Sequence, residues 1–104
     1  MTTTWAYIYE HPDTDAVDDR AVIDRSGQRT LLVPVPDAEE APEIARKLAT
    51  DDGVTMIELC GGFSVAAAAA VAAAVPDHVA VGHVTYSADS LAAAHNYAVS
   101  AASG

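Results

Sequence analysis

Residues 53–86 constrain the fold most, because they predict a strand, a Gly-Gly turn, a helix and a second strand in succession. Residues 54–59 are apolar apart from two polar side chains, which is typical of a strand covered on both faces. Ser64 is a good N-cap for the alanine-rich helix predicted over 65–75, and residues 79–86 are again rich in β-forming side chains. A strand, a helix and a strand in this order indicate a right-handed βαβ crossover between parallel strands.

The rest of the chain adds strands before this unit and helices on either side of it. Before this unit we expect a strand over 5–9, a loop or single helical turn over 14–20, and a hairpin of strands 20–25 and 28–35 around Ser26-Gly27. We then expect a helix that Asp37 begins and Gly53 ends. After the unit, a last helix should run from a cap at 87–90 to about residue 102. The sequence therefore predicts one α/β domain over residues 1–104. We expect a small mixed sheet with parallel central strands (the first, fourth and fifth), an inserted β-hairpin, and helices packed on the sheet. Whether the hairpin pairs within the chain or with another subunit stays open.

The charge of the chain excludes some classes of partner. Five Lys and Arg against fifteen Asp and Glu give a formal net charge of −10, whereas nucleic acids and anionic membranes are bound by clustered basic side chains. We therefore expect neither a nucleic acid nor a membrane as partner. One cysteine allows no internal disulfide, and the first ten residues lack the pattern of a signal peptide, so we expect a cytoplasmic location.

The alanine-rich segment over 65–75 is too short to span a bilayer. It indicates either a helix that a neighbouring element or subunit approaches closely, or simple compositional drift on a half-exposed helix. Because a short, alanine-rich chain buries a limited core, we expect a homo-oligomer.

Polar and titratable side chains follow the ends of the three predicted parallel strands. Because ligands of open α/β sheets bind outside the carboxyl ends of the strands, we expect these residues to form one site for a small molecule. They are Tyr9, Glu10 and His11 after the first strand; Glu58, Cys60, Gly61 and Gly62 at the fourth; and His83, Thr85 and Tyr86 at the fifth.

Glu58 is the first candidate for catalysis, since it interrupts an apolar strand where burial raises the pKa of a carboxyl group toward neutrality. The alternative is a structural carboxylate that accepts hydrogen bonds. His11 is the second candidate, as a general acid or base beside Glu10, although a loop histidine of this kind is often only a surface residue. Cys60 is either a nucleophile near a helix N-terminus or a small core residue.

The segment Gly61-Gly62-Phe63-Ser64 enters a helix, so its backbone amides are candidates to hold a carboxylate or a developing oxyanion. It is neither a P-loop nor a GxGxxG motif, and a neighbouring carboxylate disfavours phosphate. The chain also lacks the characteristic spacings of metal ligands. We therefore predict no cofactor and no metal.

Four segments together resemble one known family: WAYIYEHPDTD at 5–15, VPVPDAEEA at 33–41, GVTMIELCGGF at 53–63 and VGHVTYSADS at 81–90. The chain resembles, over nearly its whole length, a bacterial family of small α/β proteins classed as a domain of unknown function. In that family the last motif ends Val-Thr-Tyr-Gly, whereas Ser87 follows Tyr86 here, which argues against a glycine-dependent backbone contact at this turn. The resemblance implies no particular reaction.

We therefore expect a small cytoplasmic enzyme that transfers a proton on a carbonyl- or carboxylate-bearing metabolite, as an isomerase or lyase. Glu58 and His11 are its expected catalytic residues, and the other residues at the strand ends are expected to bind the substrate. The alternatives are a non-catalytic module that binds a small molecule or assembles into oligomers, and a purely structural protein that forms oligomers.

Overall fold

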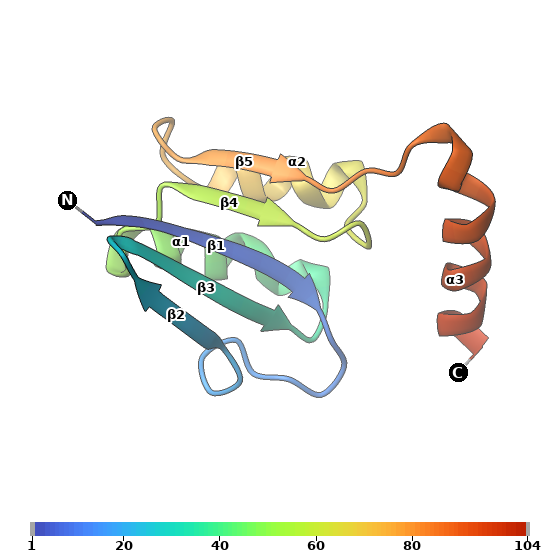
Figure 1. The fold of residues 1–104 in the computed structure, drawn as a ribbon, viewed down its shortest axis with the longest axis horizontal. Coiled ribbons are helices and arrows are strands. Elements are labelled where there is room, and N and C mark those ends of the chain that lie inside the picture. Colours follow the sequence, from blue (N-terminus) through green and yellow to red (C-terminus); the bar gives the residue numbers. More distant parts are fainter. Residues whose placement is uncertain (1, 104) are drawn as a thin grey trace.

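The structure, a computed structural model, describes residues 2–103 and consists of a five-stranded mixed sheet with two helices behind it and a third beside it (Figure 1). In chain order the elements are β1 (Thr3–Glu10), β2 (Ala21–Arg25), β3 (Gln28–Val35), the 3-10 turn η1 (Ala38–Glu40), α1 (Ala41–Asp51), β4 (Met56–Leu59), α2 (Val65–Ala74), β5 (Ala80–His83), the 3-10 turn η2 (Ala88–Ser90) and α3 (Leu91–Ser103). The α/β class expected from the sequence is confirmed.

The strands lie in the order β2-β3-β1-β4-β5. β1 pairs in parallel with both β3 and β4, β4 pairs in parallel with β5, and β2 runs antiparallel to β3. The hairpin therefore joins the sheet of its own chain, through a turn in which Ser26 and Gly27 both have positive φ (55° and 78°). The first, fourth and fifth strands are parallel as predicted, but the prediction that all three are central was wrong for β5. That strand is an edge, because β3 takes the position on the other side of β1.

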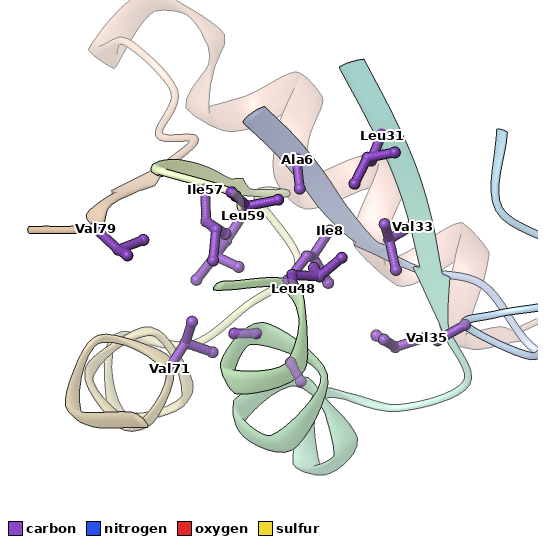
Figure 2. Packing of buried hydrophobic residues seen from close by; sticks show 14 of the residues in the cluster. Ala6, Ile8, Leu31, Val33, Val35, Leu48, Ile57, Leu59, Val71 and Val79 are labelled. Carbon is purple, nitrogen blue, oxygen red and sulfur yellow. The ribbon is translucent and has the colours of Figure 1, made fainter. Parts of the chain in front are cut away.

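The hydrophobic core lies between the sheet and the pair α1 and α2 (Figure 2). Alternate residues of the three central strands point into it and are fully buried, because successive side chains of a strand face opposite sides. They are Ala6, Ile8, Leu31, Val33, Ile57 and Leu59. Leu48 of α1 and Val71 of α2 meet them from the helix side. Because these residues of β1 and β4 point into the core, the residues between them point to the opposite face of the sheet.

Within the described residues, the opposite face of the sheet carries no helix, and we call it the open face. It consists of Trp5, Tyr7 and Tyr9 of β1, Thr30 and Leu32 of β3, Met56 and Glu58 of β4, and Gly82 of β5, as the strand registers place them. The rings of Tyr7 and Tyr9 stack with centroids 6.0 Å apart, and the indole Nε1 of Trp5 donates a hydrogen bond to Thr30 Oγ1 at 2.8 Å. The open face is therefore mostly aromatic and apolar.

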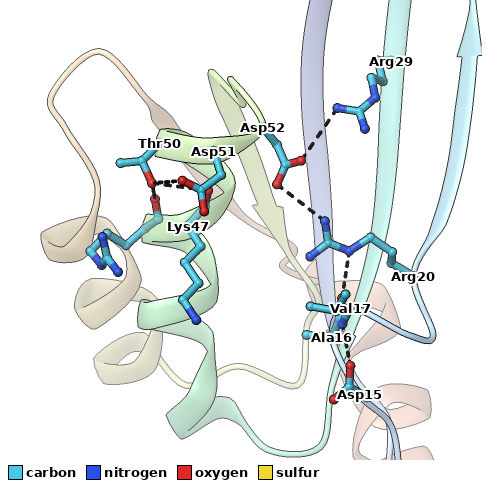
Figure 3. A network of polar contacts seen from close by, with 10 residues as sticks. Asp15, Ala16, Val17, Arg20, Arg29, Lys47, Thr50, Asp51 and Asp52 are labelled. Atoms are coloured by element: carbon cyan, nitrogen blue, oxygen red, sulfur yellow. Dashed lines mark hydrogen bonds and ion pairs between the residues drawn. The ribbon is translucent and has the colours of Figure 1, made fainter.

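A polar network ties the loop before β2 to the end of α1 (Figure 3). Arg20 donates to the carbonyl oxygen of Ala16 at 2.9 Å and lies 3.5 Å from the Asp52 carboxylate. Arg29 at the start of β3 lies 4.0 Å from the same carboxylate. After Asp52, Gly53 turns the chain toward β4 with φ of +70°, which is the left-handed conformation predicted for it.

α3 stands apart from the sheet and runs past the carboxyl ends of the parallel strands (Figure 1). Residues 91–102 are exposed, except Ala94, which is partly buried. Within the described residues, none of the helices combines the length and the apolar character that crossing a membrane requires.

Candidate functional site

The carboxyl ends of β1, β4 and β5 meet at one edge of the sheet, as adjacent parallel strands must (Figure 1). The residues that follow the first and fourth strands approach each other closely at Gly62. A Cβ atom on Gly62 would lie 3.0 Å from Oε1 of Glu10 and 3.7 Å from Sγ of Cys60. The structure therefore brings Glu10, Cys60 and Gly62 together, although about fifty residues of chain separate the two strands.

Glu58 lies on the open face, half-buried between its register partners Tyr7 on β1 and Gly82 on β5. Its neighbours in the strand, Ile57 and Leu59, are fully buried in the core, so the backbone that carries Glu58 is held firmly. A Cβ atom on Gly82 would lie 3.9 Å from Cγ of Glu58. With no side chain on Gly82, a cavity of about 310 Å³ forms beside Glu58, lined also by His83 and Val84.

Tyr7 is the register partner of Glu58 and lies near enough to Cys60 and Tyr86 for their charges to act on it. Burial raises the pKa of its phenol, and the negative charges that Cys60, Tyr86 and Glu58 carry when ionised raise it further. The Tyr7 hydroxyl therefore stays protonated at neutral pH and is a hydrogen-bond donor next to a carboxylate. Sequence reasoning missed Tyr7 because it lies inside a strand, although period-two alternation with Trp5 and Tyr9 indicates its face.

Gly61 and Tyr86 are in close contact at the same edge. A Cβ atom on Gly61 would lie 2.8 Å from the ring and the hydroxyl oxygen of Tyr86, so a side chain at this position would displace the ring. Tyr86 is nevertheless 55% exposed, because its other side faces solvent. The glycine therefore allows the residues after β5 to lie directly on the turn after β4.

The turn between β4 and α2 presents fewer groups to a ligand than the sequence suggested. The Phe63 amide donates to the Cys60 carbonyl at 3.1 Å, and the Phe63 side chain is a core residue, 3% exposed. The Ser64 hydroxyl accepts a hydrogen bond from the Ala67 amide at 3.0 Å and so caps α2. Within residues 2–103, the amides of Gly61 and Gly62 have no acceptor and remain the donors available to a ligand.

The remaining predicted residues lie at different distances from this cluster. His83 lines the small cavity, and its Nε2 atom is buried without a hydrogen-bond partner in the described part of the chain. Thr85 is exposed in the segment after β5. His11 lies past the end of β1, where its amide donates to Val35 and its Nδ1 is 3.0 Å from the carbonyl oxygen of Pro12. His11 is exposed and lines neither of the two cavities described here.

A second, larger hollow of about 670 Å³ lies between the body and α3. Gly61, Gly62 and Tyr86 line it on the body side, and small side chains of α3 with Tyr97 line it on the other. Neither hollow is lined by Lys or Arg. In the described part of the chain, no group of three or more His, Cys, Asp and Glu side chains is placed to hold a metal ion.

The family of the chain follows from its match to a family model over residues 3–98. The chain belongs to DUF6506, a family of unknown function. Comparison of this DUF6506 chain with curated proteins and with solved structures finds no match. The expected resemblance to a family of unknown function over nearly the whole chain is confirmed, and the function has to be argued from the site.

Proposed function

We propose that this DUF6506 protein is a cytoplasmic enzyme of the isomerase or lyase type, which transfers a proton on a small metabolite that carries a carbonyl or carboxylate group. Glu58 is the general acid and base of the proposal. The observation that carries it is the pairing of Glu58 with Tyr7 on the open face, beside a cavity that Gly82 leaves empty.

The two side chains have complementary roles in such a reaction. The Glu58 carboxylate accepts the proton from the carbon next to the substrate carbonyl, and the Tyr7 hydroxyl donates a hydrogen bond to the carbonyl oxygen as negative charge develops there. Return of the proton from Glu58 to another carbon completes an isomerisation. Departure of a leaving group from the neighbouring carbon completes an elimination instead. The raised pKa of Tyr7 supports this division, because a phenol that stays neutral remains a donor.

The charge around the site limits the class of substrate. The Gly61 and Gly62 amides are suited to one carboxylate or one carbonyl oxygen, and neither hollow offers a Lys or Arg side chain. A dianionic phosphate is therefore disfavoured, as are nucleic acids and anionic membranes by the net charge of −10. The single cysteine, which allows no internal disulfide, agrees with a cytoplasmic enzyme.

A non-catalytic module that binds the same class of small molecule is the second candidate. The observation that favours it is the position of His11, which lines neither cavity and so is not placed to act with Glu58 on one substrate. In the enzymatic proposal Tyr7 takes the place that the sequence suggested for His11.

Solvent exchange of carbon-bound hydrogen tests the proposal without knowledge of the natural substrate. The protein is incubated in D2O with a panel of small keto acids, hydroxy acids and aldehydes, and loss of the signal of the hydrogen next to the carbonyl is followed by proton NMR. We expect exchange of at least one compound with the wild-type protein and a loss of about 100-fold or more with Glu58→Gln, which keeps the shape but cannot accept the proton. Glu39→Gln in η1 is the matched control and should exchange at the wild-type rate.

Binding without exchange separates the two candidates. If saturation-transfer NMR shows a compound bound while its hydrogen does not exchange, the binding module is correct and the enzyme is not. If Glu58→Gln exchanges as fast as the wild-type protein, Glu58 has no part in proton transfer.

A further inference from the structure

α3 is not packed on the body of its own chain. Its residues are exposed or only partly buried, and the hollow of about 670 Å³ separates its inner side from the Gly-Gly turn. The hollow is open to solvent, so the inner side of α3 and the Gly-Gly turn are not packed on each other. A helix of this length is also marginal in water without tertiary contacts.

The side of α3 that faces the hollow is apolar. Ala94, Ala98 and Ala101 line the hollow at helical spacing, and Tyr97 lines it beside them with 77% of its surface exposed. All thirteen residues of α3 lack a carboxylate, an ammonium or a guanidinium group. α3 is therefore an uncharged surface on a chain whose net charge is −10.

The open face of the sheet is the matching unpaired surface. Three aromatic side chains of β1 lie on it together with Leu32 and Met56, and Met56 is 41% exposed. On this face of β1, β3, β4 and β5 Glu58 is the only charged residue, and Arg25 of the edge strand β2 lies on the same face by register. Neutral surfaces such as these two add no local repulsion between two chains of net charge −10, so they are suited to self-association.

The segment between β5 and α3 directs α3 away from the open face of the same chain. The Val84 amide continues the ladder to Leu59 at 2.9 Å, and the Tyr86 ring lies directly on Gly61. The Ser87 carbonyl then accepts the Ser90 amide at 2.9 Å, which holds η2 and starts α3 across the carboxyl ends of the strands (Figure 1). These contacts favour a surface of another molecule as the partner of α3.

We propose that the partner is a second copy of this chain. Side chains of its open face fill the hollow and pack on the apolar side of α3, while its own α3 covers the open face of the first copy in return. A helix of this length is about 20 Å long, so each docked helix buries about 700 Å² over both surfaces, and two reciprocal contacts reach about 1,400 Å². This is the size of a stable, specific interface. The α3 of the second copy would also exclude water from Tyr7 and Glu58.

A pair of charge substitutions on the full-length chain tests the dimer. In sedimentation equilibrium at about 100 µM we expect the mass of two copies for the wild-type chain and an increase of about 100-fold in the dissociation constant for Ala94→Glu on α3. Met56→Glu on the open face should weaken the dimer to a similar extent. Ser100→Glu, on the polar side of α3, is the matched control and should stay within about 3-fold of the wild-type value.

Mixing the two weakened variants tests whether each copy docks its α3 on the open face of the other. Ala94→Glu keeps an intact open face and Met56→Glu keeps an intact α3, so an equimolar mixture regains one of the two contacts and forms more dimer than either variant alone. Circular dichroism checks that both variants are folded, and glutamine replaces glutamate at a position where the charge prevents folding.

Three outcomes overturn the proposal. They are a wild-type chain that keeps the mass of one copy, a dimer that Met56→Glu leaves intact, and a mixture that forms no more dimer than its components. The first would mean that α3 packs on its own chain or on a different protein. Because the assay measures mass, its outcome is independent of whether Glu58 transfers protons.

Discussion

Substitution by alanine should raise the free energy of unfolding at Gly82 and lower it at Gly53. A Cβ atom on Gly82 would have its nearest neighbour at 3.9 Å, an ordinary contact, and Gly82 does not have a positive φ. A Cβ atom on Gly53 would meet nothing within 4 Å, but its φ is +70°. An added methyl group has room at both sites, so a difference in stability between the two variants reports the effect of backbone conformation.

For Gly82→Ala we expect an increase of about 0.7 kcal/mol in the free energy of unfolding, because alanine reduces the conformational entropy of the unfolded chain without strain in the strand. For Gly53→Ala we expect a decrease of about 1 kcal/mol, because the left-handed conformation costs a residue with a side chain more than that gain. In urea denaturation these values correspond to midpoint shifts of about +0.4 M and −0.6 M.

The substitution of Gly82 should also affect the proposed site. The added methyl group narrows the cavity beside Glu58, so Gly82→Ala should bind the compounds found by NMR more weakly while the protein becomes more stable. Gly82→Val should abolish binding because it fills more of the cavity. Shifts of the same sign for Gly82→Ala and Gly53→Ala would refute the reasoning, since the backbone difference between the two sites would then have no effect.

Two further predictions concern electrostatics. Of the four tyrosines, Tyr7 should lose its proton at a higher pH than an ordinary phenol, and Glu58→Gln should lower its pKa by removing one negative charge while the larger effect of burial remains. The folded state holds this proton more tightly than the unfolded state does, so Tyr7 contributes its full stability below its ordinary pKa of about 10. That contribution is lost as the pH rises through the pKa of Tyr7 in the folded state. Absorbance titration measures the pKa, and unfolding experiments between pH 9 and 12 measure the loss of stability. Asp52→Asn removes both ion pairs with Arg20 and Arg29 and should cost about 1 kcal/mol of stability in urea denaturation at low salt, and less at high salt. A cost that does not change with salt would contradict an ionic origin.

The sequence predicted the elements of the fold well where local patterns are strong. The bounds of β3 were predicted correctly, and Gly53 and Ser64 have the roles in ending α1 and capping α2 that their residue types suggested. The order of the strands was harder, because β3 is as apolar as β4 and nothing local indicates which of them lies beside β1. For the same reason the edge position of β5 was not foreseen.

The sequence predicted which of the candidate site residues lie near one another better than it predicted how each side chain is placed. The carboxyl ends of adjacent parallel strands must meet, so Glu10, Cys60, Gly62 and Tyr86 were expected near one another, and the structure places them so. The roles depend on which way side chains point after the strands end, where the period of two no longer applies. Phe63 therefore lies in the core, whereas the sequence suggested that it binds substrate.

The central position of β1 has a consequence for synthesis on the ribosome. β1 is made before both of its neighbours in the sheet, and β4 follows only after the hairpin β2–β3 and α1 have been made. Until β4 is made, the nascent chain presents an aromatic strand with at least one unsatisfied edge, which is a substrate for chaperones and for misassembly with other nascent copies. Slow translation before β4 should therefore lower the yield of native protein, whereas slow translation after β5 should have little effect.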